Sequence, residues 1–198
     1  MRDALNWARW WADGWRHAHP DWFSCTLPGL SVEQAQTLLL HPHVDLGKAF
    51  AIPPCLPCKP NPVVLHIALA QPAQRDFILA LVNHTCRPLL PSRLNTEQQR
   101  WCLRLAKALQ PHAWLRQTDD ALQLLQAWVE PPIWQRIRLG FDCPRVKALE
   151  QSPPLSLTIS PIKLQALWQA VVWRANLPSQ DLTTVHTKAQ DHALSTQD

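Results

Sequence analysis

The chain has 198 residues, of which 46% are hydrophobic and 17% are charged, and its formal net charge is +4. This composition supports a folded core of one domain or at most two small ones, and the charge is weaker than the concentrated basic field of a dedicated DNA-binding protein. With only 4 glycines and no glycine-rich phosphate-binding motif, the sequence excludes a nucleotide-binding fold of that type and disfavours a β-sandwich with many tight hairpins.

The N-terminal residues predict a helix that is rich in tryptophan. Over residues 3–17, apolar residues recur at helical spacing, and Trp10 lies about 100° away from the main apolar stripe. Arg9 and Asp13 interrupt the apolar run, so the segment does not have the pattern of a signal peptide. We expect a cytoplasmic protein with reduced cysteines and no direct membrane insertion.

The next segments predict a loop, a short helix and a connector. We expect residues 25–29 to form a loop, and Ser31 with Gln34 has the pattern of a capping box that opens a helix ending near residue 41. Residues 42–62 then contain six prolines, a density at which no regular element survives.

From residue 63 onward the pattern is helical. Expected helices follow residue 63, Pro72, Asn95 and residues 118–120, because each of these starts is followed by an apolar stripe. A short helix from Pro132 with an extended exit, and a helix opened by Ser160 and Pro161, complete the set.

The predicted fold class is all-α: an irregular multi-helix domain with a Pro-rich connector and little or no sheet. The predicted organisation is an N-terminal helical piece, the connector, a main helical domain and a disordered tail, at residues 1–41, 42–62, 63–178 and 179–198. The sequence is compatible both with two separate helical pieces and with two pieces that share a core.

The pair Cys55 and Cys58 is the motif with the most chemical character. Two thiolates at this spacing can share a tetrahedral zinc ion, with His41 and His43 as the remaining ligands. Alternatively, two cysteines occur by chance in a Pro-rich segment, since no second such pair follows. We expect no cofactor, and zinc remains the alternative.

No catalytic constellation stands out in the sequence. His66 and His84 fall on or near apolar helical faces, where a histidine is more often structural, and Cys86 is close to His84 only along the chain. We therefore expect a protein that is not an enzyme.

Two groups of basic residues could form a patch. A nucleic-acid interpretation would place them on phosphates, with Trp101 or Trp134 stacking on bases, whereas a solvated helix face is the simpler interpretation. The two groups are Arg100, Arg104 and Lys107, and then Arg136, Arg138, Arg145 and Lys147.

We predict two partner-binding surfaces on proteins. Tryptophan is enriched at interface hot spots, and a basic stripe suits an acidic partner. The predicted contact residues are Trp7, Trp10, Trp11 and Trp15 of the first helix, with Arg100, Arg104 and Lys107 as the basic stripe. The alternative for the tryptophans is that they cover the core.

The C-terminal third resembles a known family. Residues 120–128, the Glu130–Pro131–Pro132 break and the basic-apolar run 134–139 resemble the accessory adaptor of bacterial type III secretion sorting platforms, the SctK-like family. Residues 63–81 and 95–99 are similar to the central helices of that family.

This resemblance implies an all-α, non-enzymatic cytoplasmic adaptor that is peripheral to the inner-membrane apparatus. It would link the cytosolic domain of the inner-membrane ring to the pod protein that carries the export ATPase complex. The alternatives are a helical nucleic-acid-binding or regulatory protein, or a small zinc-stabilised module.

Overall fold

A computed structural model describes residues 2–27, 29, 31, 33–34, 37–38, 46–155 and 160–177 of the chain. Within these residues the regular elements are helices and no strand is present, so the predicted all-α class is confirmed. The elements are α1 (Arg2–Asp13), η1 (Gly14–His17), α2 (Asp21–Thr26), α4 (Pro62–Leu69), α5 (Pro72–Cys86), α6 (Thr96–Leu109), α7 (Leu122–Trp128), α8 (Pro131–Ile137), η2 (Arg138–Gly140), α9 (Cys143–Gln151) and α10 (Pro161–Ala175).

Many of the helices begin where the sequence predicts, because the start signals are local. A proline occupies the first turn of α4, α5, α8, α9 and α10, where its missing N–H costs no helical hydrogen bond. Asn95 and Gln98 form a complete capping box at α6. The Ser31–Gln34 capping box is also confirmed, since each side chain accepts a hydrogen bond from the other residue's backbone N–H.

Three local predictions need correction. The expected loop at residues 25–29 begins later, since Cys25 and Thr26 belong to α2. The expected extended exit after α8 is the 3₁₀ helix η2, and α9 was not predicted at all. These short helices are fixed by the core residues that they bury, among them Phe23, Leu139 and Val146, rather than by their own propensity.

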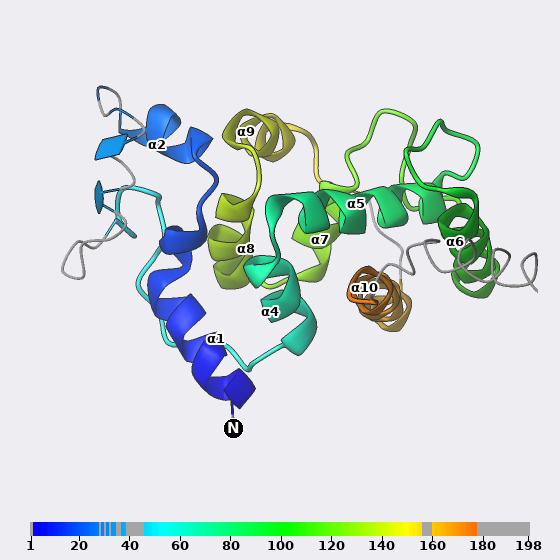
Figure 1. The fold of residues 1–198 in the computed structure, drawn as a ribbon, viewed down its shortest axis with the longest axis horizontal. Helices are drawn as coiled ribbons and strands as arrows, with labels where there is room; N and C mark the ends of the chain where they lie inside the picture. The colour runs from blue at the N-terminus through cyan, green and yellow to red at the C-terminus, as the bar shows by residue number, and fades with distance from the viewer. Residues whose placement is uncertain are drawn as a thin grey trace, which may run out of the picture.

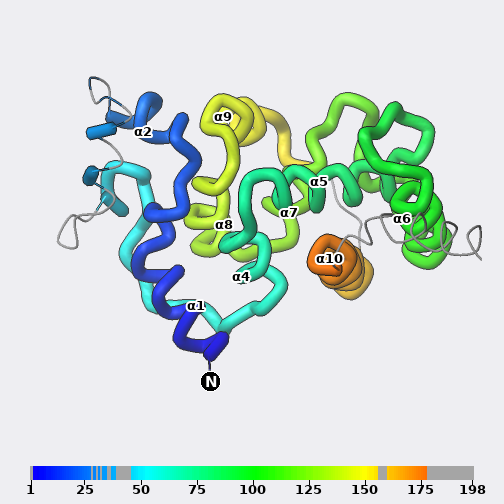
Figure 2. The backbone as a smooth tube through the Cα atoms, viewed as in Figure 1, coloured from blue at the N-terminus to red at the C-terminus, as the bar shows by residue number. Residues whose placement is uncertain are grey.

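The helices form an elongated arrangement (Figures 1 and 2). At one end, α1, α2, α4, α8 and α9 lie together, and at the other end α6 lies beyond α10. Between them runs α5, which packs against α6 and α10. One continuous cluster of buried residues extends from Trp7 of α1 to Val172 of α10, so the N-terminal helices and the helices after the connector share a core.

The connector passes beside α1 (Figure 1). Residues 52–61 have no regular structure, as the proline density predicts. The proposed His41 and His43 zinc ligands and the predicted tail at 179–198 lie outside the described residues. No helix in the described part of the chain is long and apolar enough to cross a membrane.

Candidate interaction surface

The tryptophans of α1 and η1 belong to the core. Trp7, Trp10, Trp11 and Trp15 are each between 1% and 4% exposed, so the prediction that they form a contact surface is wrong. The rings of Trp7 and Trp10 lie 5.1 Å apart between centroids, which is within the usual range of aromatic pairs. Trp10 lies off the main apolar stripe, as predicted, yet it is buried because α1 is covered on more than one side.

The second cover of α1 is the connector. The indole N–H of Trp7 donates to the carbonyl oxygen of Cys58 at 2.9 Å, and that of Trp11 donates to the carbonyl oxygen of Cys55 at 3.0 Å. These bonds satisfy two N–H groups that burial would otherwise leave without a partner. The connector is therefore held against the tryptophan helix, which it helps to bury.

Arg136 of α8 contacts both α1 and the connector. Its guanidinium carbon lies 4.0 Å from the centroid of the Trp11 ring, and its Nε donates to the Trp11 carbonyl oxygen at 3.0 Å. The same side chain donates to the carbonyl oxygens of Pro132 at 3.0 Å and Pro53 at 3.4 Å. One buried guanidinium thus joins α1, the connector and α8.

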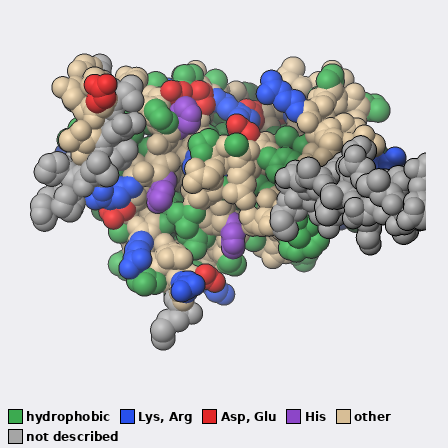
Figure 3. Space-filling model, viewed as in Figure 1, with side chains coloured by type: hydrophobic (Ala, Val, Ile, Leu, Met, Phe, Trp, Pro, Cys, Tyr) green, Lys and Arg blue, Asp and Glu red, His purple; other side chains and the backbone are tan. Residues whose placement is uncertain are grey.

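The second basic group of the nucleic-acid interpretation is not an exposed patch. Arg138 is buried like Arg136, pairs with Glu150 at 3.2 Å and donates to the Phe50 carbonyl oxygen at 3.0 Å. The Trp134 ring is 4% exposed and cannot stack on a base. On the face shown in Figure 3, basic and acidic side chains lie in small separate groups. This part of the nucleic-acid interpretation is wrong, because these arginines bind the protein's own backbone and carboxylates.

The Cys55–Cys58 pair is not part of a metal-ligand group within the described residues. No set of three or more His, Cys, Asp or Glu side chains gathers there in a way that could hold a metal ion. Burial, and then a hydrogen bond to Glu130, raise the pKa of the Cys58 thiol, which disfavours the thiolate that zinc binds. Through their carbonyl groups these residues bind Trp7 and Trp11, which gives them a structural role.

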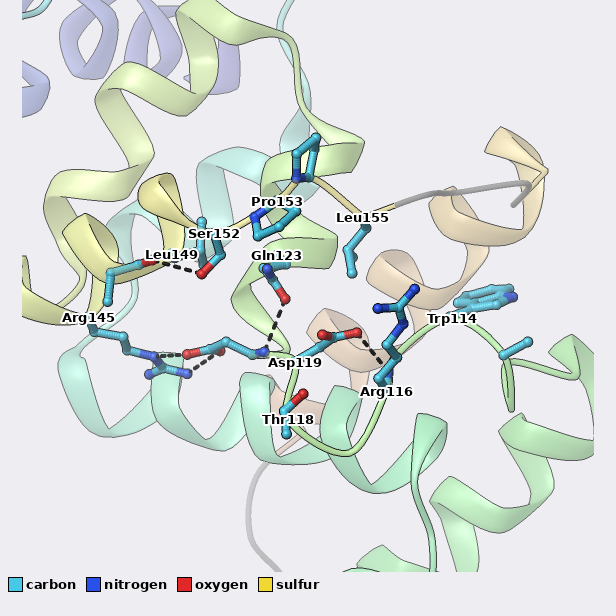
Figure 4. A pocket seen from close by; sticks show the side chains of 14 residues that line it. Trp114, Arg116, Thr118, Asp119, Gln123, Arg145, Leu149, Ser152, Pro153 and Leu155 are labelled. Carbon is cyan, nitrogen blue, oxygen red and sulfur yellow. Dashed lines mark hydrogen bonds and ion pairs between the residues drawn. The ribbon is translucent and has the colours of Figure 1, made fainter.

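A cavity of about 880 Å³ lies between the segment before α7 and the end of α9 (Figure 4). Its most prominent polar contact is the ion pair in which Arg145 donates to both carboxylate oxygens of Asp120, at 2.6 and 2.8 Å. Burial disfavours ionised Asp120, but the bonds from Arg145 and from the Leu122 N–H outweigh it and hold the pKa of this carboxyl below its usual value. Because these groups satisfy one another, the cavity has the character of a structural cleft.

The basic stripe of α6 is exposed. Arg100, Arg104 and Lys107 lie on the outer side of the helix, while Cys102 and Leu109 on the inner side are buried. Within the described part of the chain, none of the three basic side chains forms a hydrogen bond or an ion pair. The exposure that a partner contact requires is present, and the contact itself stays a prediction.

Sequence reasoning missed the groove beside this stripe. A groove of about 480 Å³ separates α6 from α10, with the Trp173 ring 61% exposed on its α10 side. Its lining residues are Glu97, Trp101, Arg104, Leu105, Ala170, Trp173 and Arg174. Part of the groove could be recognised from the sequence, because Ile162, Ala166 and Trp173 form a second apolar stripe on α10. No pattern in the sequence, however, indicates that α10 lies beside α6.

No protein-family model, curated protein or solved structure matches this chain.

Proposed function

We propose that this protein is a non-enzymatic adaptor of a bacterial type III secretion apparatus, which links the inner-membrane ring to the pod protein of the sorting platform. In this role it would be cytoplasmic and peripheral to the inner-membrane apparatus. The family resemblance of residues 120–139 supports the assignment to a secretion apparatus, and the exposed basic surface of α6 supports the binding of a protein partner.

One observation carries the adaptor proposal: the row Arg100, Arg104 and Lys107 is exposed beside an open groove with an exposed tryptophan. By contrast, Arg136, Arg138 and Arg145 form hydrogen bonds to the protein's own backbone or carboxylates. A basic row that has no internal partner among the described residues, next to exposed aromatic surface, has the composition of a protein-binding site for an acidic partner.

The test is assembly in the source cell. We expect the protein to co-purify with the ring and pod components and to show no activity by itself. Reversing two charges, with Arg100→Glu and Arg104→Glu, should slow assembly and reduce the slowing that added salt causes in the parent chain, because exposed charges act mainly on association rate and the attraction that ions screen is then absent.

The matched control is Arg2→Glu with Arg9→Glu, which reverses the same number of charges on exposed positions of α1. This control should assemble and secrete at the normal rate. Co-purification with neither component would refute the proposal. Salt-sensitive binding of the isolated protein to DNA or RNA through the α6 row would favour the nucleic-acid alternative instead.

A further inference from the structure

Helix α10 presents apolar residues on two sides. The inner side is buried in the core and consists of Leu164, Leu167, Trp168, Val171 and Val172. On the outer side, Ile162 is 81% exposed and Trp173 is 61% exposed, with the half-buried Ala166 and Ala170 between them. A helix that needed only to cover the core would carry polar residues on this outer side.

The outer stripe has the spacing of a helix-binding seam. Ile162, Ala166 and Trp173 occur at positions i, i+4 and i+11, so they follow one face for about three turns, or about 16 Å. Large side chains stand at the two ends, and small alanines lie in the middle. This profile lets a second helix approach the middle of α10 closely while its own apolar residues contact the two ends.

The charges beside the stripe are mostly positive. Arg104 and Arg174 line the groove together with one acid, Glu97, and that acid is already paired with Arg174 at 2.6 Å. Beyond Arg104, the α6 row adds Arg100 and Lys107. An apolar seam with a basic rim is complementary to a helix whose apolar face is bordered by Asp or Glu.

We propose that the groove between α6 and α10 receives an acidic amphipathic helix from a partner protein. This inference rests on the adaptor function and specifies the chemistry of the partner. Trp173 is the main anchor in the groove, and Arg104 faces the acidic border of the partner helix. Ile162, which lies on the same stripe of α10 beyond the groove lining, contacts the far end of that helix.

A second copy of the chain does not supply such a helix from its described part. Among the described helices, α1 contains two acidic residues and each of the others has at most one. Another potential occupant is the chain's own segment 178–198, which contains three aspartates and one lysine. The experiment distinguishes both from a different protein.

Site-specific photo-cross-linking tests the proposal in cells that express the full chain. The photoreactive p-benzoylphenylalanine is placed at Gln169, which is exposed on the outer side of α10 one turn before Trp173. A matched probe at Leu89, which is 98% exposed in the loop after α5, reports non-specific capture. We expect the Gln169 probe, but not the Leu89 probe, to cross-link one acidic amphipathic segment of a different protein.

The captured segment is then made as a synthetic peptide of about four helical turns, and its affinity is measured by fluorescence anisotropy. Trp173→Ala should weaken binding about 30-fold, the factor that corresponds to a hot-spot contribution of about 2 kcal/mol. Arg104→Glu should weaken binding and reduce its salt dependence, because a repulsive charge replaces an attractive one. Both side chains are exposed, so the fold of each variant should remain intact by circular dichroism.

Four outcomes would overturn the inference: cross-linking to residues 178–198, to a second copy of the chain, to a segment without acidic residues, or to nothing. None of these four would by itself refute the adaptor function, which depends on co-purification and on the effect of reversing Arg100 and Arg104. Conversely, capture of an acidic helix from a protein outside the secretion apparatus would refute the adaptor function and leave the groove assignment in place.

Discussion

Gly140 of η2 allows the side chain of Arg75 from α5 to approach the backbone closely. The buried Arg75 of α5 donates from Nε to the Ala70 carbonyl oxygen at 2.9 Å and from Nη1 to the Gly140 carbonyl oxygen. A Cβ atom at Gly140 would lie 3.0 Å from the Arg75 guanidinium carbon and would overlap the neighbouring nitrogen. The absence of a side chain at position 140 therefore allows the guanidinium to reach the backbone of η2.

We expect Gly140→Ala to lower the free energy of unfolding by about 1–3 kcal/mol, the usual cost of overpacking. The melting temperature should fall by roughly 2–4 °C for each kcal/mol in a chain of this size. The control is Gly14→Ala, whose Cβ would meet the nearest atom, the Cβ of Arg136, at an ordinary 3.4 Å. Equal melting temperatures for the two variants would show that Arg75 can move aside at no cost.

At the scale of elements, α1 is a core helix that the connector and α8 enclose. Trp7, Trp10 and Trp11 are buried, and the bonds from Trp7 and Trp11 to the connector add to the packing of their rings. Helix α10 carries one tryptophan in the core and one on the surface, since Trp168 is fully buried and Trp173 is exposed. Burial rather than residue type therefore decides which tryptophan can contact a partner.

We predict that Trp10→Ala destabilises the isolated protein by about 3–5 kcal/mol, because it empties a large volume in the core. Trp173→Ala, which removes the same side chain from an exposed position, should change stability by no more than about 0.5 kcal/mol. Urea denaturation of the two variants provides the comparison. A Trp10→Ala variant as stable as the parent chain would contradict the placement of α1 in the core.

The sequence predicted the elements whose signals are local. Asn95 with Gln98 and the Ser160–Pro161 pair mark helix starts within three or four residues, so the bounds of α6 and α10 could be expected closely. Helix α9 was missed because charged residues interrupt its apolar pattern, and its stability comes from the burial of Val146 and Leu149 in a core assembled from distant segments.

The candidate surface was predicted only in part, for the same physical reason. Periodicity showed that Arg100, Arg104 and Lys107 share one face of α6, and this property belongs to a single helix. It could not show that the connector binds Trp7 and Trp11 of α1, or that α10 lies beside α6, because both depend on contacts between segments far apart in the chain. Trp10 was therefore assigned to the surface, and Trp173 was not considered.

At the scale of the whole molecule, two histidines with lowered pKa values couple stability to pH. Burial lowers the pKa of His84, and partial desolvation with the nearby charge of Arg75 lowers the pKa of the more exposed His17, against a smaller opposing effect of Asp13. The Nδ1 atom of His84 has no hydrogen-bond partner among the described residues, so nothing there compensates a positive charge on the ring. The folded protein therefore keeps both rings neutral at a pH where the unfolded chain begins to bind protons.

We predict that the free energy of unfolding decreases as the pH falls through 6.5, the ordinary histidine value, and continues to fall until the lowered pKa values of the folded state are reached. Urea denaturation at about pH 7.5 and about pH 5.5 brackets this range. His84→Gln should reduce the difference between the two measurements. A parent chain that is equally stable at both values would contradict the prediction; carboxyls such as Asp120 act at a lower pH.

The fold also joins the N-terminal helices to residues near position 140 across long stretches of chain. Arg136 binds the backbone of Trp11 across 125 positions, and the Trp22 indole binds the Phe141 carbonyl oxygen across 119 positions. At a synthesis rate of roughly 5–20 residues per second, a ribosome needs about 6–25 s to make the intervening residues. During that interval α1 has been made but α8, which supplies Arg136, has not, so a chaperone that shields aromatic side chains has its longest opportunity to bind at the first helix.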